Sequence, residues 1–227
     1  RQEIWGYETY GLFQSEQEIA GAANQDKVSG GIKLMPGDIR FVDRNNNGVI
    51  DWGDNTVDNP GDKKIIGNST PRYHYGINLG ADWKGFDLGI FFQGVGKRDL
   101  YLPGTSFRSH YGSEWQVPSA YNNDYWTEEN TGAYFPRARF NGGSAINQAQ
   151  TRYMVDASYC RLKSLSIGYT LPKVLTQKAS IEKIRIYFTG ENLFTISDTP
   201  DGLDPELDNP YTYPMQRSLS VGLSLTF

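Results

Sequence analysis

The sequence of 227 residues contains no apolar run near the roughly 18 to 20 residues that a membrane-spanning helix needs. It has a single cysteine, Cys160, so no disulfide can form within the chain. Lys and Arg are not clustered and the formal net charge is -4, which argues against nucleic acid as a partner. The chain opens without a basic segment, an apolar stretch and a cleavage site, and we interpret it as a mature or truncated polypeptide.

Residues suited to catalysis are also scarce. The two histidines, His74 and His110, stand beside no recognisable Ser or Cys nucleophile motif. The GVGK sequence at 94–97 lacks both the spacing of a phosphate-binding loop and the Ser or Thr that follows its lysine. Adjacent acids such as Glu128 and Glu129 are typical of a solvated surface. We therefore expect that the chain is not an enzyme.

The end of the chain, residues 217–227, alternates without interruption between apolar and small polar side chains. Because successive side chains of a strand point to opposite faces, one face consists of Leu, Val and Phe and the other of Ser, Gly and Thr. A tilted strand that crosses a bilayer needs about 9 to 11 residues, whereas strands of soluble proteins are usually about 5 to 6 long. This stretch alone fits a soluble half-buried strand equally well, so the choice between a soluble sheet and a membrane barrel depends on the other strands.

A hairpin of the same design is expected around a tight turn at Lys84 and Gly85. The apolar face of residues 73–83 carries aromatic side chains at both ends and aliphatic side chains in the middle. Residues 86–93 continue the alternation after the turn. Aromatic residues at both ends of an apolar band are typical of the girdles of membrane β-barrels, so this hairpin favours a membrane barrel.

A second hairpin is expected from residues 159–171 and 184–194, in which Leu162 is out of phase and predicts a β-bulge. Ile4–Phe13 reads as a further strand, and with the terminal strand the count is about six. The predicted fold is therefore all-β, a segment of a transmembrane antiparallel β-barrel. Since the smallest barrels have about eight strands, the remaining strands must come from a larger barrel.

Three long connections, 14–72, 97–158 and 196–216, separate the predicted strands. If Phe227 lies on the periplasmic side, the short connections fall inside and these three fall outside, as in bacterial barrels. We therefore expect them to be extracellular loops. A short helix near Ser15–Ala20 is predicted within the first, because Ser15 and Glu18 form a capping-box pattern.

The segment 43–54 of the first long loop has the spacing of an EF-hand calcium loop. Gly48 stands at the turn in position six, and the oxygen ligands would be Asp43, Asn45, Asn47, the carbonyl of Val49, Asp51 and Asp54. Only three of these ligands are charged and the twelfth position lacks the bidentate Glu, which predicts weak Ca²⁺ binding. A turn closed by Asn and Asp hydrogen bonds without a metal explains the segment equally well.

The second long loop contains a cluster of aromatic residues: Tyr121, Tyr125, Trp126, Tyr134 and Phe135. Such side chains can stack on sugar rings. The simpler interpretation, that they pack the loop against itself, is favoured.

Several motifs together resemble one protein family. They are GDIRFVDRNNNGVIDWGD, the run IIGNSTPRYHYGINLGADWKGFDLGIFFQG, DYWTEENTGAYFPR, and SYCRLKSLSIGYTLP followed by IRIYFTGENLFT and a terminal Phe. In this order they resemble the C-terminal portion of SusC/RagA-like, TonB-linked (TonB-dependent) outer-membrane transporters of Bacteroidetes. The resemblance implies a 22-stranded barrel with an N-terminal plug, which this chain does not include.

The resemblance also implies a function and partners. Members import oligosaccharides or peptides across the bacterial outer membrane, energised by TonB, together with a SusD-like surface lipoprotein. For this chain we expect the same partners, with TonB acting through the missing N-terminal part, besides the remainder of its own barrel and the lipid bilayer. The competing hypothesis is a soluble calcium-dependent carbohydrate-binding β-module, which solubility without detergent would distinguish.

Overall fold

The computed structural model describes residues 2–101, 124–139, 144–176, 181–200, 203–207 and 212–227. The chain forms two compact units, one of Arg1–Ser69 and Leu100–Val155, the other of Thr70–Asp99 and Asp156–Phe227. Among the described residues, no helix is both long enough and apolar enough to span a membrane.

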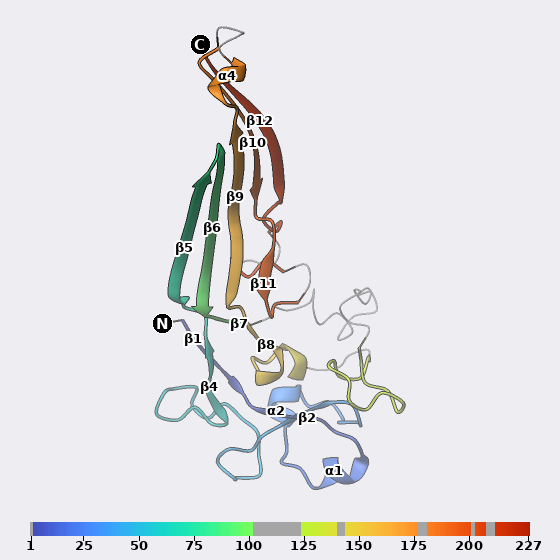
Figure 1. The fold of residues 1–227 in the computed structure, drawn as a ribbon. Helices are drawn as coiled ribbons and strands as arrows, with labels where there is room; N and C mark the ends of the chain where they lie inside the picture. The colour runs from blue at the N-terminus through green and yellow to red at the C-terminus, as the bar shows by residue number, and fades with distance from the viewer. Residues whose placement is uncertain (1, 102–123, 140–143, 177–180, 201–202, 208–211) are drawn as a thin grey trace. The chain divides into compact units, whose positions relative to one another are not determined.

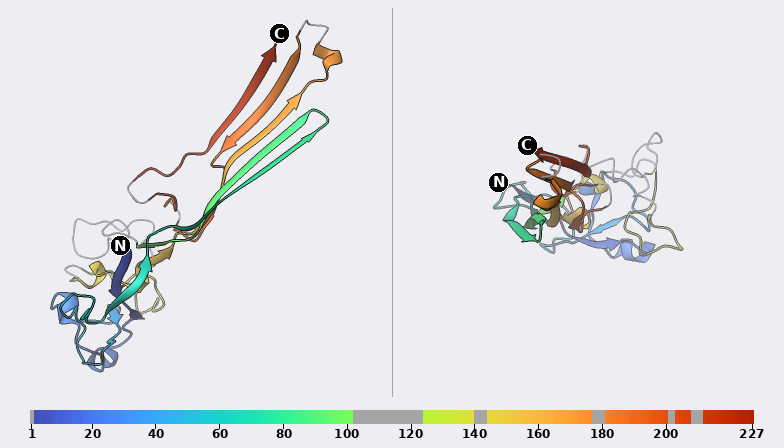
Figure 2. Two further views of the ribbon diagram at one scale, coloured as in Figure 1. Left: turned by 90° about the vertical axis from the view of Figure 1, so that its left-hand side faces the viewer. Right: turned by 45° about the horizontal axis from the view of Figure 1, so that its top comes forward.

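The second unit is a single antiparallel sheet in the order β12-β10-β9-β6-β5, with β11 paired to the remaining length of β9 (Figure 1). Its strands are β5 (Arg72–Trp83), β6 (Phe86–Lys97), β9 (Tyr159–Thr170), β10 (Lys183–Glu191), β11 (Thr195–Ser197) and β12 (Ser218–Thr226). Figure 2 shows the long strands side by side in one layer. The predicted all-β antiparallel segment is confirmed, and over the described residues this sheet does not close into a barrel.

Short connections lie at one end of this sheet. The pairs Trp83 with Phe86 and Lys183 with Thr226 place the β5–β6 turn and the start of β10 at the same end as the C-terminus. Lys84 and Gly85 have φ values of 46° and 90°, the two positive values of a turn whose twist matches the strands it joins. On the other connection, α4 (Lys173–Thr176) follows Pro172. The predicted hairpin and its turn are confirmed.

The apolar face of the sheet is uncovered. Val221 is 78% exposed and Leu219 is 62% exposed, although both lie within β12. The same holds along the other strands for Ile77, Leu79, Trp83, Phe86, Leu88, Ile167, Ile186, Leu223 and Leu225. These side chains are not packed into a protein core, so the sheet presents a broad apolar surface outward.

A β-bulge interrupts β9 where Leu162 breaks the alternation. Phe91 pairs with Ser164 and Phe92 pairs with Leu162, so Lys163 is the extra residue. The bulge returns Leu162 to the apolar face opposite Phe92. It equally brings Arg161 to the polar face, because Arg161 lies opposite Gln93.

The first unit contains two short antiparallel ladders, β1 (Glu3–Tyr7) with β4 (Lys63–Asn68) and β2 (Thr9–Leu12) with β3 (Ile39–Phe41). It also holds the helices α1 (Glu16–Ala20) and α2 (Asp26–Ser29) and the 3-10 turns η2 (Ala145–Asn147) and η3 (Thr151–Tyr153). A further ladder joins β7 (Asp99–Tyr101) and β8 (Met154–Asp156).

The prediction of one long strand over Ile4–Phe13 is wrong. The segment divides into β1 and β2, and neither belongs to the six-stranded sheet, whose sixth member is β11. Tyr7 is 1% exposed and Phe13 is fully buried, so these aromatic side chains fill a core instead of an exposed girdle. Gly11 at φ 107° and register shifts in both ladders break the extended conformation.

The predicted short helix is confirmed as α1. Ser15 is its N-cap, and its hydroxyl accepts the N–H of Glu18 at 3.2 Å. The carboxylate of Glu18 accepts the N–H of Gln14 at 2.8 Å, one residue before the partner that a capping box requires. The first and second long loops share a core, which includes Val28, Ile39 and Ile50 from the first and Ile146 and Tyr153 from the second.

Candidate functional site

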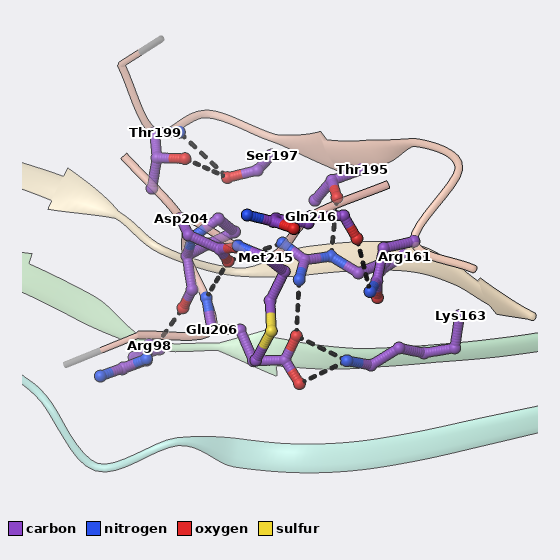
Figure 3. A network of polar contacts seen from close by, with 12 residues as sticks. Arg98, Arg161, Lys163, Thr195, Ser197, Thr199, Asp204, Glu206, Met215 and Gln216 are labelled. Atoms are coloured by element: carbon purple, nitrogen blue, oxygen red, sulfur yellow. Dashed lines mark hydrogen bonds and ion pairs between the residues drawn. The ribbon is translucent and has the colours of Figure 1, made fainter. Parts of the chain in front are cut away.

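A polar network of the second unit surrounds Arg161, which the bulge directs to the polar face of β9 (Figure 3). Its guanidinium contacts Asp204 Oδ1 at 2.6 Å and Glu206 Oε2 at 2.7 Å. Its Nε donates to Thr195 Oγ1 at 2.8 Å, from the facing strand β11. Arg161 thereby attaches the segment Leu203–Leu207, more than 40 residues later in the chain, to the sheet.

Further contacts hold the same segment. Lys163, the bulge residue, forms an ion pair with Glu206 at 2.8 Å, and Arg98 Nη1 donates to the carbonyl of Pro205 at 2.8 Å. Asp204 Oδ2 also accepts the N–H of Met215 at 2.8 Å. Figure 3 shows these groups converging between the strands and the segment.

The Arg161–Asp204 pair is withdrawn from solvent, with side chains 4% and 3% exposed. Burial raises the pKa of Asp204, but hydrogen bonds from Arg161 and from the N–H groups of Met215 and Glu206 outweigh it, so this pKa lies below its ordinary value. Removing one partner of such a pair leaves an uncompensated buried charge and typically costs about 3 to 5 kcal/mol. The segment is therefore firmly positioned.

A cavity of about 490 Å³ adjoins this network. Its polar lining residues are Arg161, Asn192, Thr195, Ser197, Thr199, Asp204 and Arg217, and its apolar ones include Leu203, Met215 and three prolines. The carbonyl oxygen of the Asn192 side chain is buried and has no hydrogen-bond partner among the described residues, while its amide donates to Gln216 O at 3.1 Å. The site thus offers both charged and neutral polar groups to a solute.

A second ion pair crosses the polar face nearer the short connections. Arg185 on β10 donates to Asp87 on β6 at 2.9 Å, and the two side chains meet over Gly168 of the intervening β9. A methyl group on Gly168 would lie 2.6 Å from Arg185 Nε. A side chain at position 168 would therefore displace the ends of Arg185 and Asp87 and separate the ion pair.

No family model matches the chain. The chain is 32% identical to the TonB-dependent receptor P3 of Formosa agariphila, over 99% of this chain and 22% of that protein. It is 30% identical to the TonB-dependent receptor SusC of Bacteroides thetaiotaomicron, over 82% of this chain and 17% of that protein. This chain belongs to the TonB-dependent receptors. It spans about a fifth of the length of the curated relatives it matches.

The fold of this TonB-dependent receptor segment also matches a solved structure described as the RagAB peptide transporter. The TM-score is 0.69 at 23% sequence identity, over 99% of this chain and 22% of that chain. The resemblance drawn from the sequence motifs is therefore confirmed, as is the barrel-segment architecture. The curated relatives are TonB-dependent receptors, in agreement with the expectation that the chain is not an enzyme.

The predicted calcium residues of the receptor segment lie in two groups. In the first, the backbone folds onto its own side chains: Asp43 Oδ2 accepts the N–H of Gly48 at 2.8 Å, and Asn47 Oδ1 accepts that of Val49 at 2.8 Å. Asn45 Oδ1 accepts the N–H of Asn47 at 3.0 Å in the same turn. These are the contacts that the metal-free alternative requires.

The other two carboxylates have different partners. Asp51 pairs with Lys27 at 2.7 Å, and this hydrogen bond together with one from Gly53 N–H lowers the pKa of Asp51. Asp54 accepts the amide of Asn59 at 2.9 Å. Over the described part of the chain, no three His, Cys, Asp or Glu side chains form a group suited to a metal ion. The donors of the spacing pattern are present, but their carboxylates do not converge.

The aromatic cluster of the receptor segment is mostly packed inward. Trp126 is 4% exposed and Phe135 is 6% exposed. The indole N–H of Trp126 donates to Gln14 Oε1 at 3.1 Å. Tyr125 and Tyr134 are partly exposed, and Tyr121 lies outside the described residues. Phe135 packs within its own loop, against Tyr134 and Tyr153, whereas Trp126 packs against Gln14 and Gly37 of the first long loop.

The Arg161 network was not predicted from the sequence. The local signals were the charged pair Arg161 and Lys163 beside a break in alternation, and the acid-rich stretch DGLDPELDNP at 201–210. Neither signal identifies the other as its partner, because the two are separated by a complete hairpin strand.

Proposed function

We propose that this chain forms part of the wall and outer loops of a TonB-dependent importer in the bacterial outer membrane. The observation that carries the proposal is the uncovered apolar face of a sheet whose strands β5, β6 and β9 are each 12 residues long. That length is sufficient for a tilted strand to cross the roughly 30 Å hydrocarbon layer. Such a face has a lower free energy in contact with lipid than in contact with water.

The opposite face suits a water-filled interior. On β12 it consists of Ser218, Ser220, Gly222, Ser224 and Thr226, all small or hydroxyl-bearing. Aromatic side chains stand at the end of the apolar face that carries the short connections, where Phe86 and Tyr169 contact each other at 4.5 Å. An apolar band with an aromatic border and a polar interior is the pattern of a transmembrane barrel.

The edges of the sheet support further strands as partners. β5 and β12 are long, exposed along their lengths and paired on one side only among the described strands. Unpaired backbone groups cannot be left in lipid, so the remaining strands of the same barrel would satisfy them.

By analogy with its relatives, the complete receptor would import an oligosaccharide or a peptide, draw energy from TonB, and act with a SusD-like surface lipoprotein. The first unit would then belong to the outer loops. The competing function, a soluble calcium-dependent carbohydrate-binding module, gains less support, because two of its five sugar-stacking candidates, Trp126 and Phe135, are buried.

A lipid-quenching experiment tests the membrane placement. A bimane label at Leu223→Cys, in a Cys160→Ser background of the complete receptor in nanodiscs, should be quenched by nitroxide-labelled lipid and not by aqueous iodide. The neighbouring Ser224→Cys label, on the other face, is the matched control and should show the reverse. Equal quenching of the two labels by iodide, with a receptor that is monodisperse without detergent, would refute the proposal.

Calcium binding stays a proposal from the spacing of segment 43–54. Its ligands would be Asp43, Asn45, Asn47, the Val49 carbonyl, Asp51 and Asp54. The ion pair between Lys27 and Asp51 opposes it, because a cation already neutralises one of the three carboxylates. We therefore propose that the segment binds Ca²⁺ only weakly, at the calcium concentrations found outside the cell.

A further inference from the structure

The cavity beside Arg161 has an uneven charge balance. Its charged lining residues are Arg161, Asp204 and Arg217. Arg161 and Asp204 neutralise each other at 2.6 Å, whereas Arg217 is exposed and has no ion pair within the described part of the chain. A solute in this cavity therefore meets one uncompensated guanidinium and, among the described residues, no uncompensated carboxylate.

A hydrogen-bond acceptor lies in the same cavity. The side-chain oxygen of Asn192 is buried without a partner among the described residues, and its amide nitrogen is held by the carbonyl of Gln216, which precedes Arg217. A buried acceptor without a donor is unfavourable, so this oxygen favours an N–H or O–H group from outside. Asn192, which needs a hydrogen-bond donor, and the cationic Arg217 both line this cavity.

Part of the cavity wall is held in place by Arg161. Leu203, Asp204 and Pro205 line the cavity, and the contacts of Arg161 to Asp204 and Glu206 attach them to β9. Arg161 itself has its guanidinium engaged by Thr195, Asp204 and Glu206, so it is not available to a solute. Its role is to position the wall.

We propose that this cavity is a solute-binding subsite for a carboxylate that stands next to a hydrogen-bond donor. Arg217 binds the carboxylate, Asn192 accepts the donor, and Arg161 is a positioning residue. A guanidinium is well suited to this task because its planar donors match a carboxylate. The proposal rests on the importer function, since that function brings solutes to the polar face.

Two sources supply this chemistry. The last residue of a peptide carries a carboxylate and an amide N–H, and a uronic acid carries a carboxylate and hydroxyl groups. Neutral sugars and amidated peptides lack the carboxylate. The subsite therefore predicts discrimination by charge, which can be measured without knowing the natural substrate.

Binding to the purified complete receptor in detergent is measured by calorimetry with trialanine, trialanine amide, trigalacturonate and maltotriose. We expect at least one acidic probe to bind tenfold or more tightly than its neutral counterpart, and the tighter of the two acids identifies the source. Arg217→Gln should weaken that binding about tenfold, and Asn192→Ala should weaken it less. The control Arg72→Gln, an exposed arginine outside the cavity lining, should have no effect.

Equal binding of acidic and neutral probes, binding of none of them, or unchanged binding in Arg217→Gln would overturn the subsite. None of these results bears on membrane placement, because binding is measured on solubilised protein. A failure of the importer proposal would appear instead in the lipid-quenching experiment.

The positioning role of Arg161 has a separate readout. In a Cys160→Ser background, maleimide labelling of Leu203→Cys should accelerate about tenfold in Arg161→Met. Glu206→Gln, which preserves the size of the side chain, should accelerate the labelling less. It replaces Arg161→Met in the experiment if that variant does not fold. Arg185→Met removes an ion pair elsewhere on the same sheet and should leave the labelling rate unchanged. Equal acceleration by Arg185→Met, or none by the first two variants, would show that Arg161 does not position this wall.

Discussion

Replacing Gly168 with alanine should fail to stabilise the sheet, although alanine is ordinarily the better residue in a strand. The reason is the ion pair that crosses above it. An added Cβ would lie 2.5 Å from Arg185 Nη2 and 2.6 Å from Arg185 Nε, and it would also collide with Asp87. Both side chains must move, and their contact is lost.

The magnitude follows from comparison with a glycine that has room. Gly89 lies on the same face, and a Cβ there would find Ser166 Cβ at 3.9 Å, an ordinary contact. Gly89→Ala should therefore gain the roughly 0.5 to 1 kcal/mol that a strand gains when glycine is replaced. Gly168→Ala should not show this gain, because the added Cβ must displace the flexible ends of Arg185 and Asp87 and break their ion pair.

The assay is the midpoint of urea unfolding of the complete receptor in detergent, followed by tryptophan fluorescence. We expect Gly89→Ala to leave the midpoint equal or higher, and Gly168→Ala to give a lower midpoint than Gly89→Ala. Combining Gly168→Ala with Asp87→Ser and Arg185→Ser removes the obstacle and should restore the midpoint to that of the double serine variant. If Gly168→Ala behaves like Gly89→Ala, or if the serine background does not relieve its cost, the reasoning from the ion pair is refuted.

Three other outcomes follow from the structure. Val221→Arg should destabilise the receptor in lipid by about 2 to 4 kcal/mol, whereas Ser220→Arg on the polar face should cost much less, as measured by unfolding from liposomes; equal costs would contradict the assignment of faces. Lys27→Met frees the carboxylate of Asp51 and should strengthen calcium protection of segment 43–54 against trypsin; if chelator changes cleavage in neither protein, the segment is a metal-free turn. The pKa of Asp204 is lower in the folded protein than in the unfolded chain, so its contribution to stability is present above the unfolded pKa of about 3.9 and is lost as pH falls through the folded pKa; pepsin should cut at 203–207 only at pH values below about 4, and cleavage that is equally fast at pH 5 would contradict this.

Much of the sheet was predictable from local pattern. The alternation along 73–83 and 217–227 identified the strands and assigned their faces, since side-chain direction in a strand depends only on position. The turn at Lys84 and Gly85 was predictable from a glycine between two alternating runs. The bulge was predictable from the break in alternation at Leu162. The family resemblance came from motifs in order along the chain, which the relatives confirmed.

The candidate site was not predictable in this way. The alternation over Ile4–Phe13 was strand-like, yet tertiary packing around Tyr7 and Phe13 divided it and removed it from the sheet. The spacing of segment 43–54 selected oxygen-bearing residues as calcium ligands, but it could not show that Asp51 would pair with Lys27.

The sequence by itself determined which residues form the long strands and which side chains share each face, because both depend on periodicity within a few residues. Only the tertiary structure decided that Arg161 meets Asp204 and Glu206 and that a cavity with Arg217 and Asn192 lies beside them. Those contacts join residues that are tens of positions apart. Their partners are selected by how the chain returns through space, which no local pattern records.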